Sequence, residues 1–155
     1  MQAYKEITYG WVILLFILPG VVLLTFLFAF QAGAKPLTFI PFLIIISLFS
    51  IVILLFYRMR VIVWNNKILL SFGVGLIWKA IEIANVESIE VVKNPFYFGW
   101  GIRMIPKGTM YNISGTRAIE LHFKDTNRIV RIGSKNPEQL KREIEARLRI
   151  LSPGK

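Results

Sequence analysis

The chain starts with two long apolar runs and then changes to a pattern in which apolar and polar residues alternate. The runs cover residues 11–30 and 36–57, contain no charged residue and are joined by the short segment 31–35. A helix rises about 1.5 Å per residue, so each run is long enough to cross a hydrocarbon core of roughly 30 Å. Neither run has the polar stripe that a surface helix of a soluble domain needs. The pattern predicts a transmembrane helical hairpin over residues 11–57.

There are two alternative interpretations: one or both runs are buried helices of a soluble domain, or the first run is a cleaved signal peptide. For the signal peptide, Lys5 precedes the run and the small residues 32–34 follow it. The run is longer than the roughly 7–15 apolar residues of a signal peptide, and a second run follows directly, so we expect an uncleaved anchor. The segment before it, residues 1–10, is interpreted as a short N-terminal tail that could include a brief interfacial helix.

The flanking cations predict how the hairpin is oriented. Arg58, Arg60 and Lys67 follow the second run closely, whereas the segment between the runs carries only Lys35 and the N-terminal tail only Lys5. Cytoplasmic flanks of membrane helices are enriched in Lys and Arg. We therefore expect a multi-pass protein of the cell (inner) membrane with both termini in the cytoplasm.

From Arg58 onward, alternating apolar and polar residues predict a series of short strands. The predicted strands are 61–64, 67–72, 77–83, 87–92, 102–105, 110–113, 117–123 and 128–132. The strands 102–105 and 110–113 flank a polar turn, residues 106–109, and are expected to form a hairpin. In the most regular strand, 117–123, we expect Glu120 and His122 on the outward face.

The chain is predicted to end in one helix that begins at Ser134 or Asn136 and stops at Pro153-Gly154. Apolar residues at helical spacing form one stripe along it, namely Leu140, Ile144, Leu148 and Leu151. We expect the stripe to pack on the sheet, since the helix is short for a coiled coil. The β domain and this helix are assigned to residues 58–151, followed by a tail, 152–155.

Composition excludes several classes of function. The segment 58–155 holds 17 of the 19 Lys and Arg residues and 8 of the 9 Asp and Glu residues, so it carries a net charge of +9. A basic domain tied to a membrane faces anionic head groups. No nucleic-acid-binding motif is present, so we expect no nucleic acid partner. The chain has no Cys, one His and no catalytic motif, so we expect no enzyme activity, metal or cofactor.

The candidate partner-contact residues are the four aromatic residues of one glycine-containing loop, Phe96, Tyr97, Phe98 and Trp100. Aromatic side chains in such a loop can line a groove for a partner or enter the bilayer interface. They can also fold back over an open end of the β domain as part of its core. All three interpretations stay open from the sequence.

Five cations are candidate contacts for anionic head groups: Arg58, Arg60, Arg103, Lys107 and Arg117. The first two follow the membrane span directly, which places them at head-group depth. The other three are expected to cluster through a β-hairpin and to bind a lipid phosphate or an acidic partner. The alternative for these three is that they are solvated charges on strand faces, and His122 is interpreted as a surface histidine.

A string of short strands followed by one helix looks like a pleckstrin-homology (PH) type domain. The stretches 99–103, 111–115, 118–121 and 131–137, together with the two spans, resemble small bacterial membrane proteins with a PH-like domain. The resemblance implies a membrane α-helical hairpin plus an all-β PH-like barrel or sandwich of about seven strands with one C-terminal helix. In eukaryotic PH domains a basic first hairpin loop binds an inositol phosphate, whereas here that loop is Asn65-Asn66 followed by Lys67, so no phosphoinositide site is carried over.

These observations lead to one main functional hypothesis and two alternatives. We expect a membrane-anchored, non-enzymatic scaffold whose cytoplasmic domain binds a protein partner or another copy of itself through exposed strand edges and the aromatic loop. The alternatives are a binder of anionic lipid head groups and an accessory subunit of a larger membrane complex.

Overall fold

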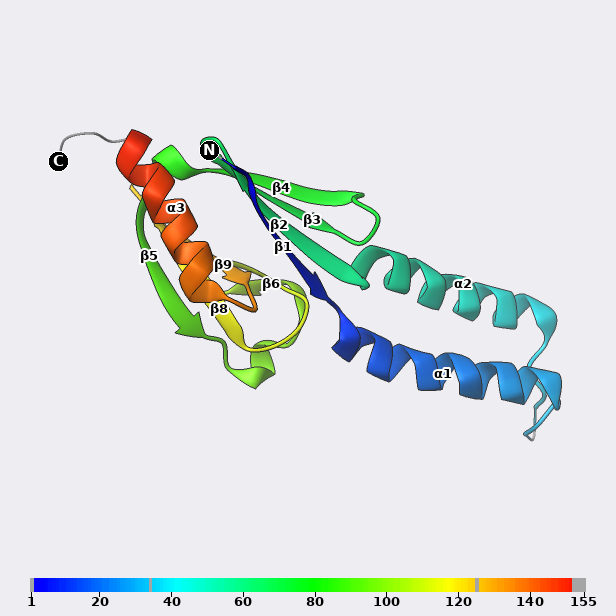
Figure 1. Cartoon of the computed structure of the whole chain (residues 1–155). Helices are drawn as coiled ribbons and strands as arrows, with labels where there is room; N and C mark the ends of the chain where they lie inside the picture. The colour runs from blue at the N-terminus through cyan, green and yellow to red at the C-terminus, as the bar shows by residue number, and fades with distance from the viewer. Residues whose placement is uncertain (1, 34, 125, 152–155) are drawn as a thin grey trace.

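A computed structural model describes residues 2–33, 35–124 and 126–151 of the chain (Figure 1). A hairpin of two helices, α1 (Trp11–Ala29) and α2 (Phe39–Phe56), projects from one end of a β domain. Both helices are long and apolar enough to span a membrane, as the sequence predicts. Their packing includes the stacked rings of Phe28 and Phe42, whose centroids lie 4.1 Å apart. The predicted tail 152–155, including the predicted helix stop, lies outside the described residues.

The first sheet has four antiparallel strands in the order β1-β2-β3-β4. Their bounds are Tyr4–Tyr9 (β1), Arg58–Trp64 (β2), Lys67–Phe72 (β3) and Ile77–Glu82 (β4). The prediction that residues 1–10 form a tail or a brief interfacial helix is wrong, because Tyr4–Tyr9 form strand β1. This strand pairs with β2 along its whole length. The reason is that α1 and α2 bring both ends of the hairpin to the same place, so the residue before α1 meets the residue after α2.

The second sheet has five described strands in the order β5-β8-β9-β7-β6. Their bounds are Val86–Lys93 (β5), Gly101–Ile105 (β6), Gly108–Asn112 (β7), Arg117–Phe123 (β8) and Thr126–Gly133 (β9). A short 3-10 helix, η1 (Ile83–Asn85), connects the two sheets, and another, η2 (Phe96–Phe98), follows β5. The predicted β6–β7 and β8–β9 hairpins are present, but β7 pairs with β9 in parallel.

The two sheets form a sandwich with a C-terminal helix, α3 (Pro137–Leu151), against one side. Leu140 and Ile144 of α3 are fully buried in the core that both sheets share, as the apolar stripe predicts. The sandwich part of the predicted fold is therefore confirmed, while the sheets are not closed into a barrel. The described residues contain nine strands rather than about seven.

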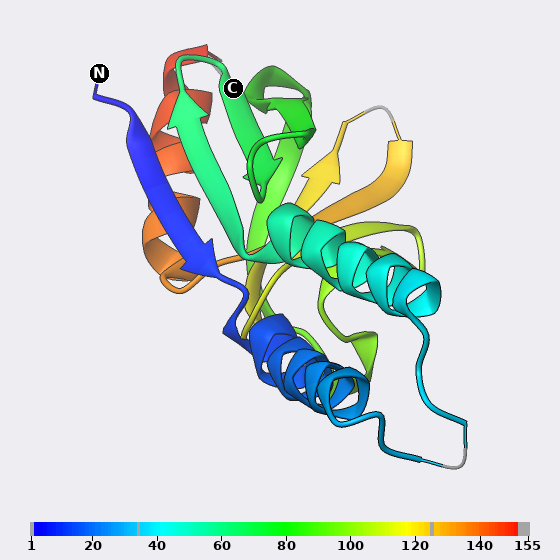
Figure 2. The same cartoon turned by 90° about the vertical axis from the view of Figure 1, so that its right-hand side faces the viewer.

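The hairpin joins the β domain without a linker, because α1 follows β1 and β2 follows α2 with one residue between each pair (Figure 2). The Gly10 N–H donates to the Tyr57 carbonyl at 2.9 Å, and a Cβ on Gly10 would lie 2.3 Å from the Phe56 carbonyl oxygen. The Phe56 ring packs edge-on against Phe72 of the core, with centroids 6.0 Å apart. These contacts, together with the lack of a linker, favour a nearly fixed orientation of the hairpin on the β domain.

Strand β1 is also tied to α3 at the far end of the chain. The buried Glu6 carboxylate accepts hydrogen bonds from the Ser134 hydroxyl at 2.7 Å and from the Lys135 backbone N–H at 2.6 Å, just before α3 begins. The buried Arg147 side chain donates to the Gln2 carbonyl at 2.8 Å. A carboxylate beside a helix N-terminus is favoured by the helix dipole. The middle of β1 is thus bonded to the segment just before α3, and the residue two before β1 is bonded to α3 itself.

Candidate binding sites

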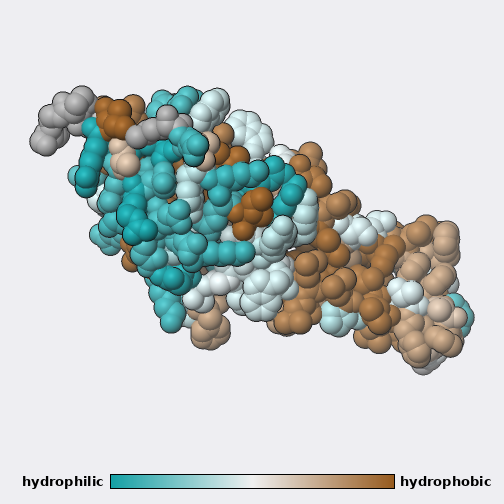
Figure 3. All heavy atoms as spheres, viewed as in Figure 1, coloured by the Kyte–Doolittle hydropathy of each residue, from teal (hydrophilic) through white to brown (hydrophobic). Residues whose placement is uncertain are grey.

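The β domain has two ends, which we name from the hairpin. The hairpin end is where the strands meet α1 and α2, and it includes the β3–β4 turn and the β7–β8 turn. The distal end carries the β2–β3 turn and the β6–β7 turn. Figure 3 shows the two regions as an apolar hairpin and a mainly hydrophilic β domain. Each candidate site lies at the hairpin end, at the distal end or between the two.

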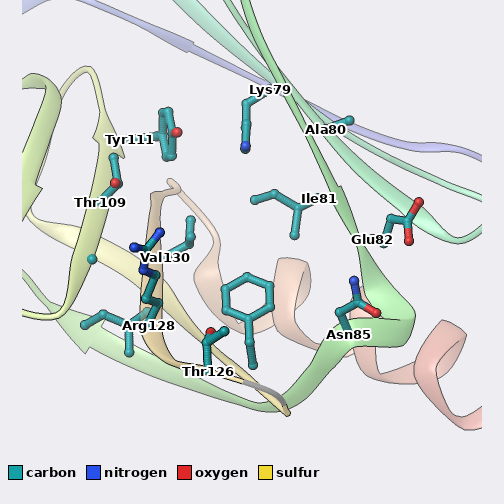
Figure 4. A pocket seen from close by; sticks show the side chains of 13 residues that line it. Lys79, Ala80, Ile81, Glu82, Asn85, Thr109, Tyr111, Thr126, Arg128 and Val130 are labelled. Atoms are coloured by element: carbon teal, nitrogen blue, oxygen red, sulfur yellow. The ribbon is translucent and has the colours of Figure 1, made fainter.

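An open cleft of about 380 Å³ lies between β4 and the second sheet, and we call it the edge cleft (Figure 4). It lies beside β4, the last strand of the first sheet, which is not paired with a strand of the second sheet in the described residues. Its lining comes from β4, η1, β7, β8 and β9 and comprises Lys79, Ala80, Ile81, Glu82, Asn85, Gly108, Thr109, Tyr111, Phe123, Thr126, Arg128, Ile129 and Val130.

Positive charge dominates the edge cleft. Lys79 from β4 and Arg128 from β9 both extend into it from opposite walls. Glu82 lies at one end, where its carboxylate is 3.9 Å from the Lys67 ammonium outside the cleft. The Tyr111 phenol is a neutral donor and acceptor at physiological pH, and burial raises its pKa further above the ordinary value of 10.0. The arrangement suits an extended ligand with acidic groups.

A second pocket, of about 400 Å³, lies at the hairpin end beside the start of α1, and we call it the interface pocket. It is lined by Tyr9, Trp11, Ser114, Gly115, Thr116, Arg117, Ser134 and Lys135. The Arg117 guanidinium forms an ion pair with Glu138 of α3. The Lys135 ammonium lies 5.7 Å from the centre of the Tyr9 ring, a cation–π distance. Hydroxyls and cations therefore meet aromatic side chains at the level where the hairpin begins.

The aromatic loop is divided between packing and exposure. Phe98 lies 5.8 Å under the Arg131 guanidinium, and the Trp100 indole N–H donates to the Gly115 carbonyl at 3.2 Å. Phe96 and Tyr97 are 80% and 72% exposed. The interpretation that the aromatic residues fold back onto the β domain therefore holds in part for Phe98 and Trp100. It is wrong for Phe96 and Tyr97.

Beneath this loop, the predicted outward position of Glu120 is wrong, because its side chain is buried. The carboxylate lies 2.5 Å from Arg131 Nε and 3.1 Å from His122 Nε2. Arg131 also donates to Asn94, the residue two before η2. The loop covers this face of the second sheet, which the alternation of β8 alone could not reveal.

The five candidate head-group cations lie in different places. Arg58 and Arg60 lie at the hairpin end of β2, where Arg58 donates to the Gly73 carbonyl at 3.2 Å. Arg103 donates to the Trp100 carbonyl, and Lys107 lies in the distal β6–β7 turn. Arg117 starts β8, which β9 and β7 separate from β6. The expected cluster of Arg103, Lys107 and Arg117 is therefore not formed.

Sequence reasoning missed Lys79 and Arg128 of the edge cleft and Lys135 of the interface pocket. They are single charges on separate strands and loops: the spacing of the two sheets brings Lys79 and Arg128 to one cleft, and Lys135 meets its pocket where β1 passes into α1. Among the described residues no group of three His, Asp or Glu side chains could hold a metal ion. No protein family model matches the chain, and the curated proteins contain no similar sequence.

Proposed function

We propose that this protein is a non-enzymatic interaction module, anchored by its hairpin and facing the cytoplasm, that holds an extended acidic segment of a protein partner in the edge cleft. The observation that carries the proposal is the free edge of β4 beside a cleft into which Lys79 and Arg128 project. In a more specific form of this proposal, the partner is part of a larger membrane complex and this protein is an accessory subunit of that complex.

The geometry of β4 supports binding by strand addition. Strand β4 pairs with β3 on one side, so its other edge presents backbone N–H and C=O groups to the cleft. An extended peptide can add to such an edge, and its side chains then enter neighbouring pockets. The cleft volume lies within the range of ligand sites, about 300–1,000 Å³. Lys79 and Arg128 would select acidic side chains on that peptide.

The short junction supports a scaffold rather than a tethered domain. Gly10 and Phe56 pack the hairpin directly against the first sheet, so the edge cleft is held at a constant height above the bilayer. The charge bias around the hairpin favours a cytoplasmic location for this cleft. A PH-like domain of a small bacterial membrane protein, which the sequence resembles, would fit this role. The proposal rests on the cleft and not on that resemblance.

The test is mass analysis of the intact protein extracted gently from its own membrane, with partners and lipids retained. The double variant Lys79→Glu and Arg128→Glu should reduce a stoichiometric partner at least about tenfold, because two attractive contacts become repulsive. The matched control is Lys93→Glu with Arg142→Glu, which changes two exposed cations outside the cleft by the same charge. A monomer without any partner, or equal loss in the control, would contradict the proposal.

A second candidate function, binding of an anionic lipid head group, is favoured by the interface pocket. Arg117 and Lys135 line it together with three hydroxyl side chains, next to Trp11 at the start of the hairpin. Cations near a membrane surface attract anionic lipids by about 1 kcal/mol each. Lys135→Glu should then lower the amount of co-purified anionic lipid, while Lys141→Glu on the outer part of α3 should not. Equal lipid in both variants would exclude this pocket as the site.

A further inference from the structure

The turn between β3 and β4 packs against the last turn of α2. The Val74 N–H donates to the Leu54 carbonyl at 3.2 Å, and the Gly73 N–H donates to the Arg58 carbonyl at 2.7 Å. A Cβ on Gly73 would lie 2.0 Å from the Leu54 carbonyl oxygen, so only glycine fits there. The backbone of the turn is therefore in direct contact with the helix.

This contact fixes the depth of the turn relative to the bilayer. Helix α2 has 18 residues and is about 27 Å long, slightly less than a hydrocarbon core of roughly 30 Å. If α2 spans the bilayer, its whole length lies within or at the edge of that core. Leu54 is two residues before the last residue of α2, Phe56. The Val74 backbone, bonded to Leu54, therefore lies at the boundary of the hydrocarbon.

The same hydrogen bond satisfies a polar group of the helix end. The last four carbonyls of a helix have no partner within the helix, and unpaired groups are costly in lipid. The Ile53 carbonyl accepts from Tyr57 N–H at 2.8 Å, and the Leu54 carbonyl accepts from the turn. A turn of the β domain thus supplies a hydrogen-bond partner for one of the last carbonyls of α2.

The side chains of the turn are apolar and exposed. Val74 is 52% exposed, and Leu76 is 75% exposed. The turn conformation comes from Gly73 and Gly75, whose φ values are +54° and +104°. Turns in water commonly use Asn, Asp or Ser, so two apolar residues here are informative. In Figure 3 the apolar surface of the hairpin continues onto the adjoining edge of the β domain.

We propose that the β3–β4 turn, residues 73–76, is inserted in the bilayer beside α2, with Val74 and Leu76 among the lipid acyl chains near the head groups. Trp78, 70% exposed on β4, then lies at the interface, where aromatic residues of membrane proteins are enriched. The occupant of this surface is lipid of any charge, because the contact is apolar. This inference is separate from partner binding in the edge cleft and from head-group binding in the interface pocket.

The absence of Cys in the sequence allows single labelling sites without other changes. Leu76→Cys and, as a second site, Val74→Cys would carry a nitroxide label in the full-length protein reconstituted in neutral phosphatidylcholine bilayers. The matched control is Asn66→Cys, in the turn at the opposite end of β3. Leu15→Cys on the exposed face of α1 gives the signal of a label in lipid. The measurement is collision of each label with oxygen, which dissolves in lipid, and with a water-soluble nickel chelate.

The labels at 74 and 76 should collide more with oxygen than with the nickel chelate, as the label at 15 does, and the label at 66 should show the reverse. Adding anionic lipid should leave these ratios unchanged within about twofold. Labels at 74 and 76 that are as open to the nickel chelate as the label at 66 would overturn the proposal. Because purified protein is used, protection by a different protein cannot produce the expected result.

Discussion

At its distal end β3 is preceded by a turn through Asn65 and Asn66, and at its hairpin end it is followed by a turn through Gly73 to Leu76. The distal turn uses polar residues, with Asn65 at a φ of +49°. The other turn obtains its positive φ values from glycines and carries Val74 and Leu76. Asn stabilises a turn by bonding to nearby backbone, which is useful in water. The two ends of β3 thus differ in turn chemistry, and the apolar turn is the one that we propose to lie in lipid.

The largest effect is expected from Gly73→Ala at the hairpin end. The new Cβ would meet the Leu54 carbonyl oxygen at 2.0 Å, and the residue would have to keep a φ of +54°. We expect a loss of about 4 kcal/mol or more in the free energy of unfolding. Gly75→Ala is the control, since its Cβ meets nothing within 4 Å, and it should cost about 1–2 kcal/mol. Equal unfolding temperatures of the two variants in detergent would show that the contact with α2 is unimportant.

The next largest loss in the free energy of unfolding is expected when a core residue at either end of β3 is truncated. Phe72→Ala should cost about 3–5 kcal/mol and Ile68→Ala about 2–5 kcal/mol, because both side chains are fully buried. Only Phe72 touches the hairpin, through Phe56. Phe72→Ala alone should therefore broaden the distance distribution between spin labels placed at Leu48 and Glu87. The same broadening in Ile68→Ala would mean that the hairpin is held by the overall stability of the domain.

A smaller effect should come from alkaline pH at the distal end of β1. Burial, and then the nearby Glu6 carboxylate, raise the pKa of Tyr4 well above its ordinary value of 10.0. As the pH rises, the Tyr4 phenol loses its proton in the unfolded chain before it does so in the folded protein. Its contribution to the free energy of unfolding is therefore fully present below pH 10 and declines as the pH rises above 10. Tyr4→Phe should make that decline less steep. Tyr111, whose pKa is also raised by burial, stays in the variant and keeps part of the slope. Unfolding curves at pH 8 to 11 that have the same pH slope in both proteins would contradict this assignment.

The smallest effect is expected at the distal turn. Asn65→Gly removes a side chain from a positive φ that Asn already tolerates, so stability should change by less than about 1 kcal/mol. Asn66→Ala, in the same turn, removes a polar side chain without adding a glycine, so it measures what that side chain contributes to stability. Chemical unfolding of both variants measures the difference. A cost as large as that of Gly73→Ala would remove the contrast between the two ends.

The sequence predicts the elements whose signal is local. The hairpin, β3, β8 and α3 follow from apolar runs, alternation and a helical stripe, and their observed bounds differ by few residues. Strand β1 was missed because its buried face carries Glu6 and Thr8, so the apolar alternation of a strand is absent. Its partners are separated from it by the whole hairpin, and periodicity within a short window contains no information on such pairing.

The candidate sites were predicted less completely than the fold. The exposure of Phe96 and Tyr97 depends on how Phe98 and Trp100 pack, which the spacing of aromatic residues does not determine. The predicted cluster around Arg103 failed because β7 pairs with β9, so that two strands lie between β6 and β8. The edge cleft depends on where the two sheets separate, and this is decided by packing between residues far apart in the sequence.

The position of Glu6 has a consequence for the order of events during synthesis. Its carboxylate is buried on β1, and the Ser134 hydroxyl that binds it comes 128 residues later in the chain. At about 5–20 residues per second, the ribosome needs roughly 6–25 s to make that stretch. During this interval the Glu6 carboxylate has the Tyr4 hydroxyl beside it but lacks the two donors that Ser134 and Lys135 later supply. Strand β1 can pair with β2 early in synthesis, but the hydrogen bonds from Ser134 and Lys135 to its buried carboxylate can form only when the segment before α3 has been translated.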